Sequence, residues 1–351
     1  MKRAAWRNRR EIAHTIRMIF IDRQGNAAWA MSDAMAGTDY IARLEARISG
    51  YGKKAVAMCS ADAAIHTALK LCGAGWGDYV FVPTFTFYTN IATVTNEGCL
   101  PVFLDCDPET RCVSVSALET AFLWSELQDK MPKAVVVDDA FGAVADFDRL
   151  LPMCKAYGVP LIELACDAFG GEYNGRPCGA CGDYGVISFA KRVDGGGGAL
   201  ILPVDEERAA REFSRGCYSE SENHDYKMHN VIAALDCAKL QSAKKIGERA
   251  KHNLAALCDG TDSVAQPTDG DAATYALCRA ARHAAAIKAA GYDVKTPPPV
   301  HTMPQYSTCP FFEHEQGFCV ARSFSDCCLV DMDISAHKRR KLAKMLRNYQ
   351  V

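Results

Sequence analysis

The stretch PLIELACDAFGGEYNGRPCGACGDYGVISFAK, residues 160–191, decides the fold. It holds two short apolar runs, 160–162 and 185–189, and each is followed by polar or small residues. Such runs are typical of strands that are buried on both faces of a parallel sheet. Because ligands bind at the carboxyl ends of parallel strands, we expect residues 163–167 and 190–198 to lie in a ligand site.

The same pattern continues upstream of this stretch. Further apolar runs, each of strand length, occupy residues 79–82, 100–104 and 134–137. Helical patterns cover residues 61–71 and 147–157 between them. Strands that alternate with amphipathic helices predict an α/β domain with a mainly parallel central sheet covered on both faces.

The character of the chain changes after residue 223. A long helical segment, 227–257, is followed by a polar connection at 259–273. The remainder predicts a helix at 276–290, a Pro-rich loop at 296–304 and a last helix at 335–349. We therefore divide the chain into an N-terminal arm with a large α/β domain, residues 1–240, and a small C-terminal α/β domain, residues 241–351.

Composition limits the partners. The 351 residues carry a formal net charge of -2, which gives no general electrostatic reason to expect nucleic acid or a membrane surface. No apolar run reaches the roughly 18 residues that a membrane span needs, and a secretory signal is missing from the first residues. The 17 cysteines lack the dense spacing of a secreted scaffold, so we expect reduced thiols and a cytoplasmic protein.

Four blocks, in order, resemble the DegT/StrS-type sugar aminotransferases. They are residues 60–90, 98–110, 160–191 and 225–254, which begin SADAAIHTALK, GCLPVFLDCDPET, PLIELACDAFG and DYKMHNVIAAL. The resemblance implies fold type I of the enzymes that depend on pyridoxal 5'-phosphate (PLP), with a small C-terminal domain. It further implies amino transfer to a keto sugar, commonly nucleotide-linked, in a homodimer whose sites are shared between subunits.

The resemblance also implies roles for individual residues. Lys191 matches the lysine that forms a Schiff base with PLP and moves a proton at the substrate carbon. Phe87 matches the aromatic residue that stacks on the ring, and Ser188 matches a serine that binds the phosphate. Ala61 and Asp62 occupy the helix start that cradles this phosphate. Ser188 and Lys191 are three residues apart, whereas the family usually has five.

Three positions depart from the family pattern in the same direction. Leu164 stands where an aspartate keeps the pyridine nitrogen protonated, and a leucine cannot do so. Asp62 would repel a phosphate, and Asp225 replaces an asparagine that reaches the partner's phosphate. These changes argue against ordinary transamination. The alternative is a divergent paralogue that has lost PLP and serves as a binding or scaffold protein, or runs different chemistry.

The remaining candidates are polar residues near the expected site. Asp139 and Asp167 are the candidates to replace the missing acid, and with Asp62, Asp138 and Asp225 they could form an acidic pocket. Lys227 replaces an arginine of the family, and His301 resembles a histidine close to the sugar substrate. Cys178 and Cys181 form a lone C-x-x-C, which we interpret as two loop thiols, and we expect no metal.

Overall fold

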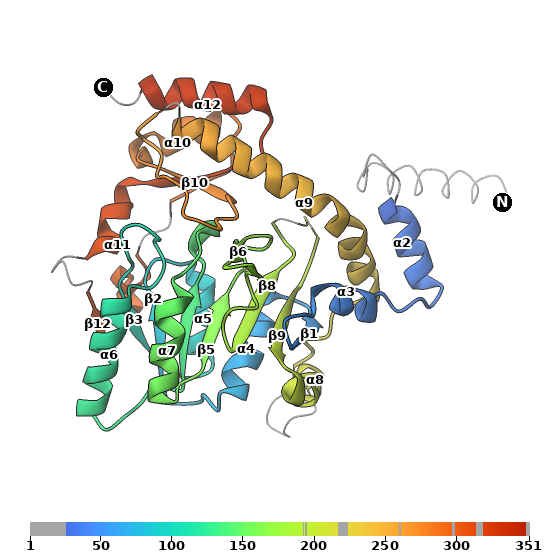
Figure 1. Cartoon of the computed structure of the whole chain (residues 1–351), viewed down its shortest axis with the longest axis vertical. Helices are drawn as coiled ribbons and strands as arrows, with labels where there is room; N and C mark the ends of the chain where they lie inside the picture. Colours follow the sequence, from blue (N-terminus) through green and yellow to red (C-terminus); the bar gives the residue numbers. More distant parts are fainter. Residues whose placement is uncertain are drawn as a thin grey trace.

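The computed structural model describes residues 26–191, 193, 195–216, 224–259, 261–296, 299–313 and 319–348. Two units are stacked along the long axis, with the large sheet below and a small helical unit above (Figure 1). The first 25 residues of the expected N-terminal arm lie outside the described part. Among the described helices, none combines the length and the apolar character that a membrane crossing demands.

The large sheet has eight strands in the order β1-β9-β8-β5-β4-β2-β3-β12. Strand β9 runs antiparallel to both of its neighbours, and the pairs from β8 to β12 are all parallel. The predicted mainly parallel sheet is therefore confirmed. Its strands are β1 (Lys53–Met58), β2 (Tyr79–Pro83), β3 (Leu100–Leu104), β4 (Ala134–Asp138), β5 (Leu161–Leu164), β8 (Tyr184–Ser188), β9 (Gly198–Pro203) and β12 (Phe311–Phe312).

Helices cover both faces of this sheet, because its strands alternate apolar side chains between two buried clusters. One cluster packs α3, α6 and α7 on the sheet, and the other packs α4, α5 and α8. Helices α4 and α7 fall on the predicted ranges. The bounds are α3 (Tyr40–Ile48), α4 (Ala61–Leu71), α5 (Tyr88–Asn96), α6 (Val115–Leu127), α7 (Phe147–Tyr157) and α8 (Glu207–Ser214). A short hairpin, β6 (Glu172–Tyr173) with β7 (Arg176–Pro177), extends the loop after β5.

Helix α9 (Asn230–Cys258) links the two units as one continuous 29-residue helix. Its first turns pack against α2 (Asn26–Met35) and α3, and its last turns lie in the core of the small unit. Figure 1 shows this helix running from the sheet edge up to α10 and α12. A rise of about 1.5 Å per residue makes it roughly 43 Å long, enough to span both units.

The small unit is built on a three-stranded antiparallel sheet, β10-β13-β11. The helix predicted at 276–290 is wrong in its first half, because Tyr275–Cys278 forms strand β10 and pairs with β13. That segment is rich in alanine, which hides a strand whose four residues are all buried. The other elements are α10 (Ala284–Ala289), β11 (Val294–Lys295), α11 (Val320–Ser323), β13 (Cys328–Asp331) and α12 (Ala336–Asn348).

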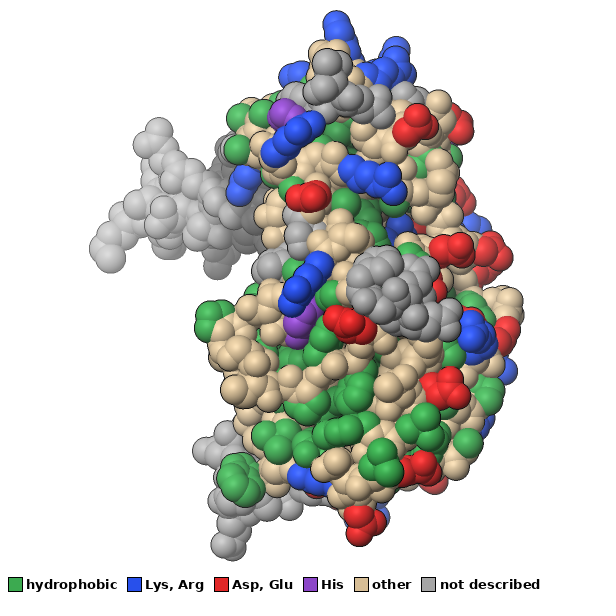
Figure 2. Space-filling view, turned by 90° about the vertical axis from the view of Figure 1, so that its left-hand side faces the viewer, with side chains coloured by type: hydrophobic (Ala, Val, Ile, Leu, Met, Phe, Trp, Pro, Cys, Tyr) green, Lys and Arg blue, Asp and Glu red, His purple; other side chains and the backbone are tan. Residues whose placement is uncertain are grey.

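The C-terminal segment also returns to the large unit. Strand β12 pairs with β3 at the sheet edge, and Val300 packs in the large-sheet core. The domain boundary at residue 240 stays a prediction, since the chain crosses between the units more than once. On the face seen in Figure 2 charges of both signs are interspersed, and hydrophobic side chains gather over the lower, large unit.

Candidate active site at the junction of the two units

Lys191 follows strand β8 and reaches across to the small unit. Its Nζ lies 2.8 Å from Asp293 Oδ2 and 2.9 Å from Asp331 Oδ2. Burial lowers the pKa of Lys191, but hydrogen bonds to the two carboxylates raise it, and the net shift is upward. The lysine is therefore held as an ammonium ion between carboxylates from the loop before β11 and the end of β13.

A second lysine lies in the same place. Lys295 Nζ lies 4.2 Å from the ring centre of Phe87 and 5.0 Å from that of Tyr275. Lys191 Nζ lies 5.0 Å from the centre of the same Tyr275 ring. Burial lowers the pKa of Lys295, and the Asp167 carboxylate offsets this only in part, so the net shift is downward. Phe87, Asp167 and Lys191, which are far apart in the chain, thus converge around Tyr275.

The start of helix α4 meets the turn between β8 and β9. Ser60 caps the helix by accepting the N–H of Ala63 at 3.0 Å. Ser188 is the register partner of Gly198, and a Cβ on Gly198 would lie 2.9 Å from the Ala61 nitrogen. Only a glycine lets these two segments approach so closely. The structure therefore brings Ala61 and Ser188 together. Asp62 is exposed in the first turn of α4. The neighbouring residues still shield its carboxyl group in part from solvent, and this raises its pKa.

Leu164 is fully buried at the end of β5 and packs in the cluster under α4 and α5. Its register partner on the next strand is Asp138, the last residue of β4. Asp138 Oδ2 accepts hydrogen bonds from Thr86 Oγ1 at 2.5 Å and from Asn90 Nδ2 at 3.3 Å. Burial raises the pKa of Asp138 to about 7, and the Asp167 carboxylate adds to this rise.

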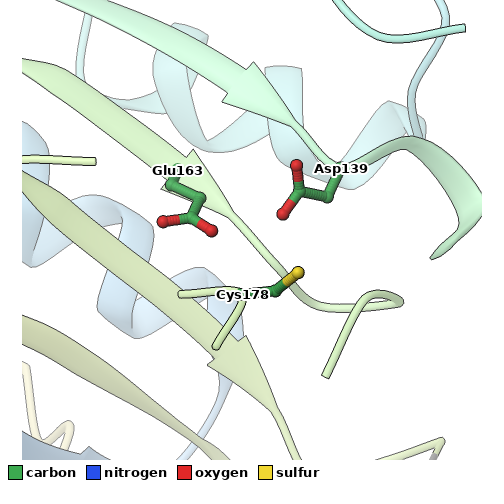
Figure 3. A group of neighbouring side chains, drawn as sticks. All are labelled: Asp139, Glu163 and Cys178. Atoms are coloured by element: carbon green, nitrogen blue, oxygen red, sulfur yellow. The ribbon is translucent and has the colours of Figure 1, made fainter. Parts of the chain in front are cut away.

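Asp139 points away from this site into the protein interior. Figure 3 shows its carboxylate facing that of Glu163, with Cys178 beside them, and one ligating atom from each lies within 4.8 Å of the others. Burial raises the pKa of all three groups. Glu163 accepts N–H groups of the loop at 179–182, at 2.5, 2.7 and 2.9 Å, which favour its ionised form. We therefore assign a proton to the Asp139 carboxyl group, which donates a hydrogen bond to the Glu163 carboxylate.

The expected acidic pocket is not assembled as one site. Asp138 and Asp139 serve the two separate environments just described, although both lie near Cys166 together with Asp62 and Asp167. Asp225 lies beside Cys59, two residues before α4 begins at Ala61. Its backbone carbonyl faces the Cys59 thiol, and its carboxylate accepts the N–H of Lys227. The Lys227 and Asp225 side chains also form an exposed ion pair at 3.4 Å.

His301 lies at the outer edge of the large sheet. Its ring stacks on Phe311 of β12 at 4.0 Å with an interplanar angle of 9°, and its Nδ1 hydrogen-bonds Thr84 after β2. Burial lowers its pKa to about 4, so the imidazole is neutral at pH 7. The predicted substrate contact of His301 stays a prediction.

Two cavities bear on the location of the site. A cavity of about 980 Å³ lies between the units, lined by Arg111, Arg279 and Arg282 among others, and it contains no predicted site residue. A smaller one of about 280 Å³ is lined by Thr86, Phe87, Tyr88 and Lys295. Because the smaller cavity opens beside Phe87 and Lys295, it belongs to the convergence around Tyr275.

Sequence reasoning missed four members of this site, all from the small unit: Tyr275, Asp293, Lys295 and Asp331. One signal was available, since the apolar run CCLV at 327–330 ends in Asp331, as the strands of the large sheet end in polar residues. Tyr275 directly precedes the helix predicted at 276–290, whose first half is in fact strand β10. Lys295 lies in the two-residue strand β11 and Asp293 lies directly before it. Such a strand is too short to be recognised from a sequence pattern.

Comparison of the sequence with known proteins identifies the family to which the chain belongs. Residues 22–289 match the model of the DegT/DnrJ/EryC1/StrS aminotransferase family. An L-glutamine:2-deoxy-scyllo-inosose aminotransferase of Streptomyces fradiae is 34% identical over 192 residues, 53% of this chain and 44% of that protein. GDP-perosamine synthase of Escherichia coli O157:H7 is 27% identical over 298 residues, 77% of this chain and 79% of that protein. The chain spans about half the length of several curated relatives that it matches.

Solved structures agree on the fold. A DegT/DnrJ/EryC1/StrS aminotransferase from Brucella abortus superposes with a TM-score of 0.83 at 22% identity, covering 93% of this chain and 95% of that one. DesV of S. venezuelae, solved with a ketimine intermediate, gives 0.81 at 20% identity, covering 95% and 96%. The predicted fold type I is confirmed, and the chain belongs to the DegT/DnrJ/EryC1/StrS aminotransferase family.

Proposed function

We propose that this chain is a PLP-dependent aminotransferase that transfers an amino group to a keto sugar, nucleotide-linked or free, with Lys191 as its catalytic lysine. The observation that carries the proposal is the convergence of Lys191, Phe87 and Asp167 at the carboxyl ends of the large-sheet strands. This is the location at which α/β sheets bind ligands. Membership of a sugar aminotransferase family supplies the reaction class.

The residues present fit PLP in three respects. The start of α4, with small Ala61 and the close approach of Gly198, forms a backbone cradle suited to a phosphate. Ser188 adds a hydroxyl beside it, and half-buried Phe87 offers a ring for stacking. When bound, PLP supplies an aldehyde that bonds to a lysine amine and a ring that accepts electrons from the substrate carbon.

The protein's own groups then have defined tasks. Asp293 and Asp331 hold Lys191 protonated in the resting state, so Lys191 must leave at least one of them before its amine can react. Once released, Lys191 can take and return a proton at the substrate carbon. The Lys295 amine lies over Phe87 beside the 280 Å³ cavity, where its protonated form can bind an anionic group of the substrate.

The second candidate is a paralogue that does without PLP. One observation favours it: the two carboxylates raise the pKa of Lys191, which opposes its action as a nucleophile. Buried Leu164 points the same way, because it cannot hold a proton on a cofactor ring.

Half-reactions distinguish the two. The purified protein is loaded with PLP, and its absorbance is followed while amino donors such as L-glutamine and L-glutamate are added, and then keto sugars. The proposal expects loss of the aldehyde form with a donor and its return with a keto sugar. A spectrum that does not change with any donor would favour the paralogue. Lys191→Ala must abolish this exchange, since the group that moves the proton at the substrate carbon is removed.

A further inference from the structure

The carboxylate missing from position 164 has a counterpart one strand away. Leu164 and Asp138 are register partners on the parallel strands β5 and β4. Side chains of register partners point to the same face of a sheet, and neighbouring strands lie about 4.8 Å apart. Asp138 therefore faces the α4 and α5 side, as Leu164 does, and the contacts of Asp138 with Thr86 and Asn90 agree with this orientation.

We propose that Asp138 is the acid that faces the cofactor ring nitrogen in this chain, in place of the residue at position 164. The inference rests on the proposed function, since it names a further residue of the same site. It differs from the sequence-based expectation, in which Asp139 and Asp167 were the candidates. Asp139 is excluded because its carboxyl group is engaged with Glu163 on the inner side.

The surroundings of Asp138 suit this task. Both hydrogen bonds that Asp138 receives end on Oδ2, and no hydrogen bond to Oδ1 is formed among the described residues. Thr86, which donates one of them, immediately precedes Phe87. One short segment thus positions both the carboxylate and the aromatic ring. A buried carboxyl group beside a pyridine nitrogen can share its proton with the ring and gains stability as a carboxylate once the ring is protonated.

The same geometry explains why position 164 is apolar. An aspartate there would place a second carboxylate on the adjacent strand in register with Asp138. Two buried carboxylates at that distance cannot both ionise without a large cost. A leucine at 164 leaves Asp138 as the only acid of the register pair. The chain thus carries the charge on β4 in place of β5.

The test is a charge-relocation series on the full chain loaded with PLP labelled with ¹⁵N in its ring. The ¹⁵N chemical shift reports protonation of the ring nitrogen independently of turnover, and PLP fluorescence gives the dissociation constant. The series compares the wild type, Asp138→Asn, and Asp138→Asn combined with Leu164→Asp. Asp139→Asn is the matched control, because it changes the adjacent carboxyl group, which points elsewhere.

The wild type and the control are expected to hold a protonated ring nitrogen. Asp138→Asn should shift the signal to the unprotonated form and weaken PLP binding by about tenfold or more, the loss expected of a charge-assisted hydrogen bond. The double variant should restore protonation. Thermal unfolding of each variant checks the fold, and asparagine can still accept the bonds from Thr86 and Asn90.

The outcomes distinguish a failure of the Asp138 assignment from a failure of the proposed function. A ring nitrogen that stays protonated in Asp138→Asn would overturn this inference and leave the aminotransferase proposal standing. A wild type that binds no PLP would overturn both. If the control loses ring protonation while Asp138→Asn retains it, Asp139 is the acid and the assignment made here is wrong.

Discussion

Lys191 Nζ and Asp331 Oδ2 lie 2.9 Å apart, and this ion pair joins the turn after β8 of the large unit to the last residue of β13 in the small unit. Asp293 adds a second contact at 2.8 Å. The amine that amino transfer needs is therefore stored as an ammonium ion at the junction of the units. Its release is a step that any catalytic cycle of this chain must include.

Removing one charge from this pair should make Lys191 more reactive. Asp331→Asn keeps the shape of the side chain but removes a group that raises the pKa of Lys191. The pH midpoint at which the Lys191 amine reacts with PLP should fall, as read by absorbance from pH 6 to pH 10. Asp333→Asn, two residues away and paired with Arg249, is the control and should leave the midpoint unchanged. An unchanged midpoint in Asp331→Asn would contradict the stored-ammonium account.

The stability effect of the same substitution should be small. Lys191 and Asp331 are partly exposed, with side-chain exposures of 28% and 20%, so solvent screens their attraction. We expect the free energy of unfolding to change by about 1 kcal/mol or less. Urea unfolding measures this, and a much larger loss would show that the pair has a mainly structural role.

The Asp139–Glu163 pair predicts a defined pH dependence. The pKa of Asp139 is raised in the folded state, so its stabilising contribution is complete below the ordinary carboxyl pKa of about 3.9. It is lost progressively as the pH rises toward the folded-state value. Asp139→Asn can still donate to Glu163, so it should keep the wild-type stability at pH 7 within about 1 kcal/mol and flatten this dependence.

Asp139→Ala gives the contrast. It leaves Glu163 without its side-chain donor and should cost about 2–3 kcal/mol at pH 7. Urea unfolding of both variants at several pH values is the measurement. Equal losses in the two variants would show that no proton is shared between Asp139 and Glu163.

His301 predicts a pH dependence of stability opposite to that of Asp139. Its pKa is lowered to about 4 in the folded state, so its contribution to stability is complete above the unfolded value of about 6.5. That contribution is lost as the pH falls through the folded value. His301→Gln should therefore reduce the loss of stability between about pH 6.5 and pH 4, as measured by thermal unfolding. An unaltered acid limb would mean that His301 titrates normally.

The cradle at the start of α4 can be closed with a single methyl group. In Gly198→Ala the new Cβ would lie 2.6 Å from the Ile187 carbonyl oxygen and 2.9 Å from the Ala61 nitrogen. We expect PLP binding to weaken strongly, with a loss of about 1–3 kcal/mol in folding stability. Gly75→Ala, where a Cβ meets no atom within 4 Å, is the matched control. Normal PLP binding by Gly198→Ala would place the phosphate elsewhere.

The large unit could be predicted from the sequence because each of its central strands is a continuous apolar run that ends in a polar residue. Residues 160–162 and 185–189 predicted β5 and β8, and the helices at 61–71 and 147–157 were found at their true bounds. The small unit was harder to predict. Its strands are two to four residues long, and alanine in β10 has no strong preference for a strand.

The site residues of the large unit could likewise be predicted, whereas those of the small unit could not. The resemblance identified the positions on the large unit, including Lys191, Phe87 and Leu164. It could not reveal that Asp138 is the register partner of Leu164, because register depends on how two strands with different loops align. Nor could it reveal Asp293 and Asp331, which meet Lys191 only through the packing of the small unit on the large one.

Borohydride reduction of the protein with bound PLP, followed by peptide mass analysis, tests directly whether Lys191 is the catalytic lysine. We expect one reduced adduct on Lys191, lost in Lys191→Ala and kept in Lys295→Ala. Lys295 is the internal comparison, because its amine lies in the same site over the Phe87 ring. An adduct on Lys295, or no adduct at saturating PLP, would contradict the assignment of Lys191 as the catalytic lysine.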